Sequence, residues 1–89
     1  METNTYTFQK IIRAKMQTEG WGHRELARRV SAAVGREVHS STITRLLKPK
    51  PTIPAGDVMV ALAGILETDA TSFIASAYAS RYSANELLG

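Results

Sequence analysis

Apolar side chains recur every three or four residues in five short stretches of this chain, and this spacing constrains the fold more than any other feature of the sequence. The stretches cover residues 7–19, 23–34, 39–48, 56–67 and 71–82. This spacing is typical of amphipathic helices, and no stretch alternates between apolar and polar residues as a half-buried strand would. Glycines and prolines separate the stretches. The sequence therefore predicts an all-α fold of five helices.

Length and composition limit the chain to one small domain. Its 89 residues, 44% of them hydrophobic, suffice for one compact core. The absence of cysteine excludes disulfides and thiolate metal sites, and His23 and His39 have no carboxylate or second histidine at a metal-binding interval. The apolar stretches are too short to span a membrane, and the N-terminus lacks the pattern of an export signal. We expect a cytoplasmic, nucleoid-associated protein with no metal, no cofactor and no enzymatic activity.

Positive charge is concentrated in the first part of the chain. Residues 1–54 contain ten Lys and Arg against four Asp and Glu, whereas residues 55–89 contain one Arg against four acidic residues. A polyanion would therefore be attracted to the first part. Taken alone, the charge is equally compatible with an ordinary solvated surface.

Three segments resemble the Cro and phage-repressor type of helix-turn-helix protein, also called the xenobiotic-response-element family. They are residues 23–30 (HRELARRV), 38–46 (VHSSTITRL) and 61–66 (ALAGIL). In this family a helix containing Leu-Ala is followed by a turn and a Ser/Thr-rich recognition helix. The resemblance implies a compact five-helix lambda-repressor-like DNA-binding domain over residues 1–82. Residues 83–89 would then form a short C-terminal tail, because residues 83–86 have the spacing of a capping box.

The spacing within the motif departs from the family. Ala27 and Ile43, the two residues that would pack against each other, are sixteen residues apart, six more than is usual in the family. We interpret the extra residues as an additional turn of the first motif helix and a longer turn, because Val30 and Val34 continue its apolar face. In the alternative register Ala33 packs on Ile43, which places a charged residue where an apolar one is expected. We prefer the register with Ala27.

The resemblance places a recognition helix at about residues 40–48 and implies two kinds of contact with double-stranded DNA. The residues expected to contact bases are Ser40, Ser41, Thr44 and Arg45. The residues expected to contact phosphates are His23, Arg24, Thr42, Lys48 and Lys50. Arg45 is the expected specificity residue, because a guanidinium can bond O6 and N7 of guanine together.

These features predict a sequence-specific transcriptional regulator, of the phage or bacterial repressor type, that binds an inverted-repeat operator as a homodimer. Small residues in the last predicted helix would let a second subunit approach closely. The expected dimer contacts are Phe73, Tyr78, Tyr82, Leu87 and Leu88. No part of the sequence suggests a small-molecule ligand.

Two other hypotheses remain open at this point. One is a protein-interaction module, similar to an antitoxin or adaptor, that binds its partner through the fifth helix. The other is an architectural protein that binds DNA without sequence preference. A DNA-binding protein must gather its cations on one face, which the sequence alone does not show.

Overall fold

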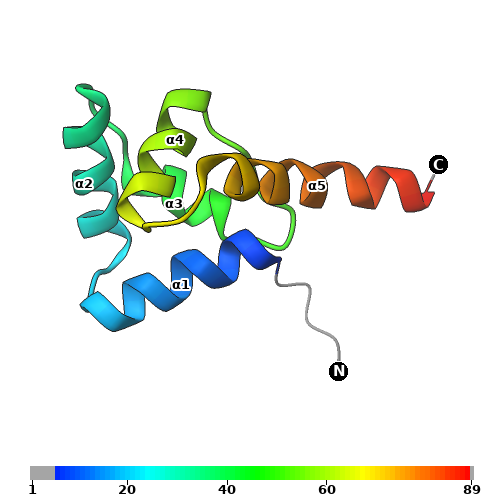
Figure 1. Cartoon of the computed structure of the whole chain (residues 1–89), viewed down its shortest axis with the longest axis horizontal. Coiled ribbons are helices and arrows are strands. Elements are labelled where there is room, and N and C mark those ends of the chain that lie inside the picture. The colour runs from blue at the N-terminus through cyan, green and yellow to red at the C-terminus, as the bar shows by residue number, and fades with distance from the viewer. Residues whose placement is uncertain (1–5, 89) are drawn as a thin grey trace.

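The computed structural model describes the backbone of residues 6–88 and the side chains of residues 6–80. Within this range the chain forms five helices and no strand (Figure 1), so the predicted all-α class is confirmed. The helices are α1 (Thr7–Glu19), α2 (His23–Val34), α3 (Ser40–Leu46), α4 (Gly56–Ile65) and α5 (Ala70–Leu88).

Two glycines end the first two helices, as the sequence predicts. Gly20 and Gly35 have φ angles of 74° and 78°, in the left-handed region that only glycine adopts at little cost. Their backbone N–H groups bond to the carbonyls of Met16 and Ser31, which closes the last turn of each helix. These turns set where α2 and α3 begin.

All five helices contribute to one core. Its fully buried large side chains are Phe8, Ile12, Leu26, Val30, Ile43, Leu46, Met59, Leu62 and Phe73. The rings of Phe8 and Phe73 meet edge to face with their centroids 6.1 Å apart, which joins α1 to α5. Each such side chain contributes about 1.5–3 kcal/mol by leaving water, so this shared core holds the short helices together.

The burial of alanines in α2 decides between the two registers of the motif. Ala27 is only 3% exposed and lies in the core with Ile43, whereas Ala33 is exposed. Val30 is buried and Val34 packs against the core from the last turn of the helix. The structure therefore places Ala27, and not Ala33, in the core with Ile43, and α2 continues to Val34.

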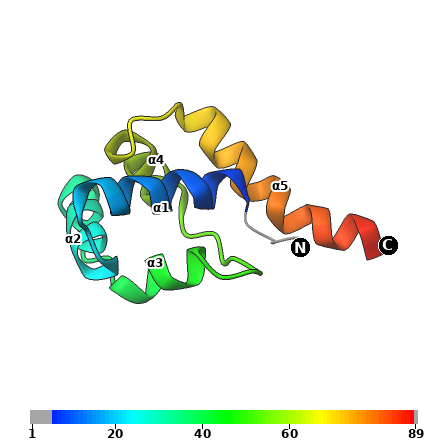
Figure 2. The ribbon, with the colours of Figure 1, turned by 90° about the horizontal axis from the view of Figure 1, so that it is seen from below.

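Helix α5 is longer than the sequence analysis predicts. It runs without interruption to Leu88 and reaches past the body of the domain (Figures 1 and 2). Residues 83–86 thus continue the helix, and the expected end of the fifth helix at residue 82 is wrong. The physical reason is that no glycine or proline occurs between Ala70 and Leu88, so nothing stops the helix.

One of the expected dimer contacts is a core residue. Phe73 is 1% exposed and packs on Phe8, so it is not available to a second subunit and that assignment is corrected. Tyr78 is 37% exposed on the same helix. The side chains of Tyr82, Leu87 and Leu88 lie outside the described residues.

Candidate nucleic-acid interface

Helices α2 and α3 lie next to each other at one edge of the domain. They pack against each other, and residues 35–39 make the turn between them. In Figure 2, α3 lies along the lower edge with no other helix beyond it. Its outer side is therefore open to a partner.

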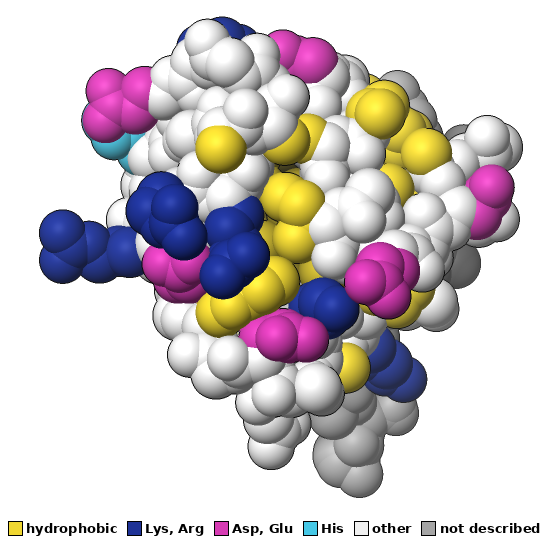
Figure 3. Space-filling view, turned by 60° about the vertical axis from the view of Figure 1, so that its left-hand side comes forward, with side chains coloured by type: hydrophobic (Ala, Val, Ile, Leu, Met, Phe, Trp, Pro, Cys, Tyr) yellow, Lys and Arg dark blue, Asp and Glu magenta, His cyan; other side chains and the backbone are white. Residues whose placement is uncertain are grey.

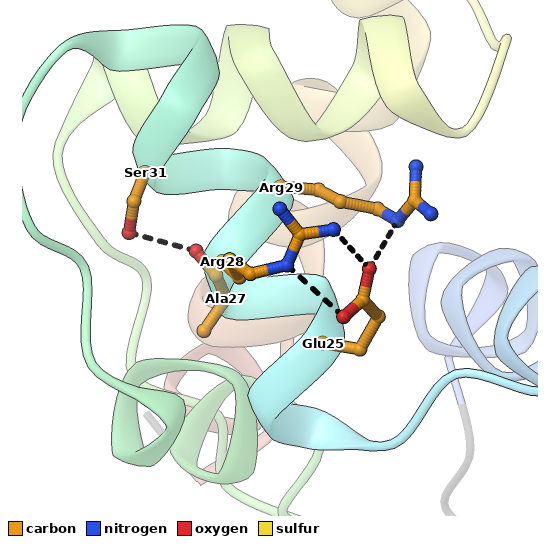
Figure 4. Close-up of polar contacts among 5 residues, drawn as sticks. All are labelled: Glu25, Ala27, Arg28, Arg29 and Ser31. Carbon is orange, nitrogen blue, oxygen red and sulfur yellow. Dashed lines mark hydrogen bonds and ion pairs between the residues drawn. The ribbon is translucent and has the colours of Figure 1, made fainter.

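Ser31 anchors the turn that leads into α3. Its hydroxyl oxygen lies 2.8 Å from the carbonyl oxygen of Ala27, one turn earlier in α2 (Figure 4), and accepts a hydrogen bond from the backbone N–H of Val38 at 2.8 Å. Val38 is itself buried. The two contacts hold the turn against α2 and so position the first residue of α3, a role that the sequence analysis did not assign to Ser31.

Two side chains of α1 hold the other end of α3. The side-chain amide of Gln9 donates to the carbonyls of Leu46 at 3.0 Å and Lys48 at 2.8 Å, and Arg13 donates to the carbonyl of Leu47 at 2.9 Å. A helix leaves its last carbonyls without hydrogen-bond donors of its own, and α3 has only seven residues. The side chains of α1 supply donors for carbonyls at this end. The sequence analysis missed them.

The outer side of α3 carries the residues expected to contact bases. Ser41, Thr44 and Arg45 are exposed, and Ser40 is half-buried beside α2. Ile43 points into the core. The structure thus brings these four polar side chains together on one short, anchored helix.

The first turn of α2 lies beside α3. His23 Nδ1 is 2.7 Å from Thr44 Oγ1, so the two helices share a side-chain hydrogen bond. Arg24 and Ser40 line the same hollow of about 400 Å³ between α2 and the start of α3. The two residues of α2 that are expected to contact phosphate, His23 and Arg24, therefore lie beside α3.

Thr42 lies on a different flank of α3. It is half-buried and lines a hollow of about 300 Å³ together with Arg36, Pro54 and Val58, near the start of α4. The structure does not bring it next to His23 and Arg24. Thr42 could therefore contact a phosphate only on a DNA strand that passes along this flank of α3.

The loop after α3 carries two exposed lysines. Lys48 and Lys50 directly follow the helix, and neither side chain is buried. The N–H of Thr52 bonds back to the carbonyl of Arg45 at 3.2 Å, and Ile53 packs against the core. The loop is therefore folded against the domain, which keeps both lysines close to the end of α3.

Three other arginines, on α2 and in the turn that follows it, are bound to acidic partners. Glu25 accepts hydrogen bonds from Arg28 and from Arg29, the latter at 2.8 Å between residues four apart on the same helix (Figure 4). The bond from Arg28 holds the pKa of the Glu25 carboxyl below its ordinary value. Arg36 binds Asp57 at 2.8 Å and, chiefly through that hydrogen bond, holds the pKa of the Asp57 carboxyl below its ordinary value.

The cations without a partner gather around α3. Within the described side chains, no hydrogen bond or ion pair engages those of Lys10, Arg24, Arg45, Lys48 and Lys50. Four of these five lie on the first turn of α2, on α3 or on the loop that follows, and only Lys10 lies on α1. Unpaired, exposed cations on one surface are the arrangement that phosphate groups require. We call the surface formed by His23, Arg24, Ser40, Ser41, Thr44, Arg45, Lys48 and Lys50 the α3 surface.

Another hollow, beside Trp21, differs from the α3 surface in its charge. It has a volume of about 700 Å³ and is lined by charged residues of both signs and by small apolar residues of α2 and α4 (Figure 3). The guanidinium of Arg29 lies 4.2 Å from the centre of the Trp21 ring, which also packs against the core. Lys15 lies near both Glu19 and Glu67. The charges here compensate one another, so this hollow does not form a basic site.

No protein-family model, no curated protein and no solved structure matches this chain. Among the described residues, no group of three or more His, Cys, Asp or Glu side chains is arranged to hold a metal ion. None of the helices within residues 6–88 combines the length and the apolar character that crossing a bilayer requires. The argument for function therefore rests on the geometry of the α3 surface.

Proposed function

We propose that this protein is a sequence-specific DNA-binding transcriptional regulator that acts through the α3 surface. The observation that supports this most strongly is the sorting of charge. Arg28, Arg29 and Arg36 are bound to carboxylates, whereas Arg24 and Arg45 beside or on α3 are not. A protein that binds DNA must leave such cations available for phosphates and base edges.

The dimensions of the unit suit the major groove of DNA. A single α-helix fits this groove, and the helix that enters it needs an exposed polar face and a rigid attachment to the domain. Helix α3 has both, because Gln9 holds its end and Ser31 holds the turn before it. We expect Arg45 to contact guanine, and Arg24 and Lys48 to contact phosphates on the flanking strands. Such binding would place the protein at the nucleoid.

We further propose that two copies bind together, through α5, to an inverted repeat. The support is that α5 extends past the body of the domain and that Tyr78 is exposed on it (Figure 1). Deleting residues 83–89 should weaken self-association in analytical ultracentrifugation. An unchanged oligomer after the deletion would contradict a role of this segment in the dimer.

A protein-interaction module is the second candidate function, and the same projecting helix favours it. The two functions predict different effects of substitutions. Partner binding by an adaptor would depend on α5 and tolerate loss of Arg45, whereas DNA binding by a regulator would not tolerate loss of Arg45. Binding DNA without sequence preference is a third outcome. It would appear as equal affinity for all duplexes at every salt concentration.

The experiment that tests the proposed function is selection of bound sequences from a pool of random DNA duplexes. Recovery of a conserved inverted repeat would support sequence-specific binding by a dimer, and a conserved single half-site would support binding by one copy. Arg45→Ala should recover a less conserved site, and Lys10→Ala, which removes an unpaired cation outside the α3 surface, should recover the same site as the unaltered protein. Recovery of no conserved sequence, with weak binding to all duplexes, would contradict the proposal.

A further inference from the structure

Thr44 differs from its neighbours on the outer side of α3 because its hydroxyl group is engaged within the protein. Its Oγ1 atom lies 2.7 Å from Nδ1 of His23 and 3.2 Å from the carbonyl oxygen of Ser40, one turn earlier in the helix. Thr44 is nevertheless exposed. A threonine hydroxyl has one hydrogen to donate and two lone pairs that accept. What Thr44 offers to a ligand therefore depends on where its hydrogen points.

Both arrangements of the hydrogen bonds use that hydrogen inside the protein. If Nδ1 of His23 carries a proton, it donates to Thr44 Oγ1, and the Thr44 hydroxyl donates to the Ser40 carbonyl. If Nδ1 carries no proton, it accepts, and the Thr44 hydroxyl donates to it instead. In either case only a lone pair of Oγ1 remains for a group outside the protein.

We propose that Thr44 recognises a base amino group in the major groove and that His23 is the positioning residue that makes it an acceptor. This inference rests on the proposed DNA-binding function. The N4 amino group of cytosine and the N6 amino group of adenine are the hydrogen-bond donors that base pairs present in this groove, whereas O6 of guanine and O4 of thymine only accept. A Thr44 hydroxyl that can only accept a hydrogen bond therefore favours cytosine or adenine as the base that it faces.

His23 acts by limiting the side-chain rotation of Thr44. A threonine in a helix divides its population between two rotamers, and the bond to Ser40 at 3.2 Å is long. The shorter bond to His23 holds the hydroxyl in one of them. Without His23 the hydroxyl can turn outward and donate to guanine or thymine, so the preference for an amino group should weaken.

The contact itself can be tested in the free protein by NMR of the histidine ring nitrogens. Thr44→Val keeps the shape of the side chain and removes the hydroxyl, so it should shift the ring nitrogen signals of His23. His39, which is exposed on the turn and has no contact with Thr44 among the described residues, serves as the internal control. Unchanged His23 signals in Thr44→Val would show that the hydrogen bond is absent and would overturn the inference.

The base preference is tested on the duplex recovered by selection, with each of the four base pairs placed in turn at every position. The unaltered protein should favour cytosine or adenine over guanine or thymine, by a few-fold to about tenfold, at one position where Thr44→Val abolishes the preference. His23→Ala should reduce this preference at that position alone. His23→Asn, which keeps a hydrogen-bonding atom at the place of Nδ1, should restore part of it. Thermal unfolding of each variant establishes that it is folded.

Three results would overturn the inference while leaving the proposed function intact. Thr44→Val could change no base preference, the position that depends on Thr44 could favour guanine or thymine, or His23→Ala could weaken binding equally at every sequence. The last result would make His23 a phosphate contact only. If the unaltered protein selects no sequence at all, the proposed function fails, and this inference fails with it.

Discussion

The buried amide of Gln9 is expected to contribute strongly to stability, because it connects α1 to the end of α3. Gln9 is 2% exposed. Its amide nitrogen donates to the carbonyls of Leu46 and Lys48, and its amide oxygen accepts from the N–H of Tyr6 at 3.2 Å. Gln9→Leu introduces an apolar side chain of similar size and removes all three bonds.

The magnitude follows from the carbonyls that lose their donor. A buried polar group left without a partner costs about 1–3 kcal/mol. The bond to Leu46 is fully buried and the bond to Lys48 is partly open to water, so the two together should cost about 2–4 kcal/mol. For a domain of this size the loss corresponds to a decrease in Tm of roughly 10–30 °C. Circular dichroism during heating and urea titration would measure it.

Gln9→Glu separates hydrogen bonding from packing, because glutamate has nearly the same shape as glutamine. Its carboxylate would place a negative oxygen against two carbonyl oxygens. Below a pH of about 4 the protonated acid can still donate one bond, so the loss of stability should grow as the pH rises above that value. Gln17→Glu, on the exposed side of the same helix, is the matched control. If Gln9→Glu were as stable as Gln17→Glu at pH 7, the role assigned to Gln9 would be refuted.

Three further predictions concern the α3 surface and its support. Arg45→Ala should weaken binding to the selected duplex by about 1–3 kcal/mol and relax the preference at one base pair, and equal losses on selected and random duplexes would mean that Arg45 contacts phosphate. Lys48→Ala combined with Lys50→Ala should weaken binding to all duplexes and reduce the slope of log affinity against log salt by about 2 per subunit, and an unchanged slope would mean that neither lysine contacts DNA. Asp57→Asn should lower Tm at neutral pH, because the ionised carboxylate binds Arg36 and its pKa is lowered in the folded state. That difference in Tm should begin to shrink below a pH of about 4, where the carboxyl of the unfolded chain takes up its proton, and should disappear below the lowered pKa of the folded state. A difference that persists at low pH would show that the ion pair is not its cause.

The sequence predicted the helices well where local signals decide them. Glycine at positions 20 and 35 marks the ends of α1 and α2, and the apolar spacing predicted five helical stretches, each of which is a helix in the structure. It failed at α5, where the capping-box spacing of residues 83–86 suggested a new start. The absence of glycine and proline after Ala70 was the better guide, because a helix continues until something stops it.

The candidate site could be predicted only in part, because pairing between distant residues decides which cations are available. The bond between Glu25 and Arg29 joins residues four apart on one helix, a spacing that favours such pairs, whereas Arg36, in the turn after α2, binds Asp57 on α4, twenty-one residues away. Gln9 likewise reaches a carbonyl thirty-seven residues away. Its position at the edge of the apolar face of α1 was the only local sign of its burial. Such contacts follow from the packing of helices and not from spacing along the chain.

NMR chemical-shift mapping with a duplex recovered by selection tests the central claim most directly. The account predicts that the backbone amides of residues 40–48, together with those of His23 and Arg24, change most when DNA is added. The matched controls are the amides of Ala32, Ala33, Gly64 and Ile65, which line the charge-compensated hollow beside Trp21 and should change little. Changes concentrated on α5 or around Trp21, with α3 unaffected, would contradict the claim that this protein binds DNA through α3.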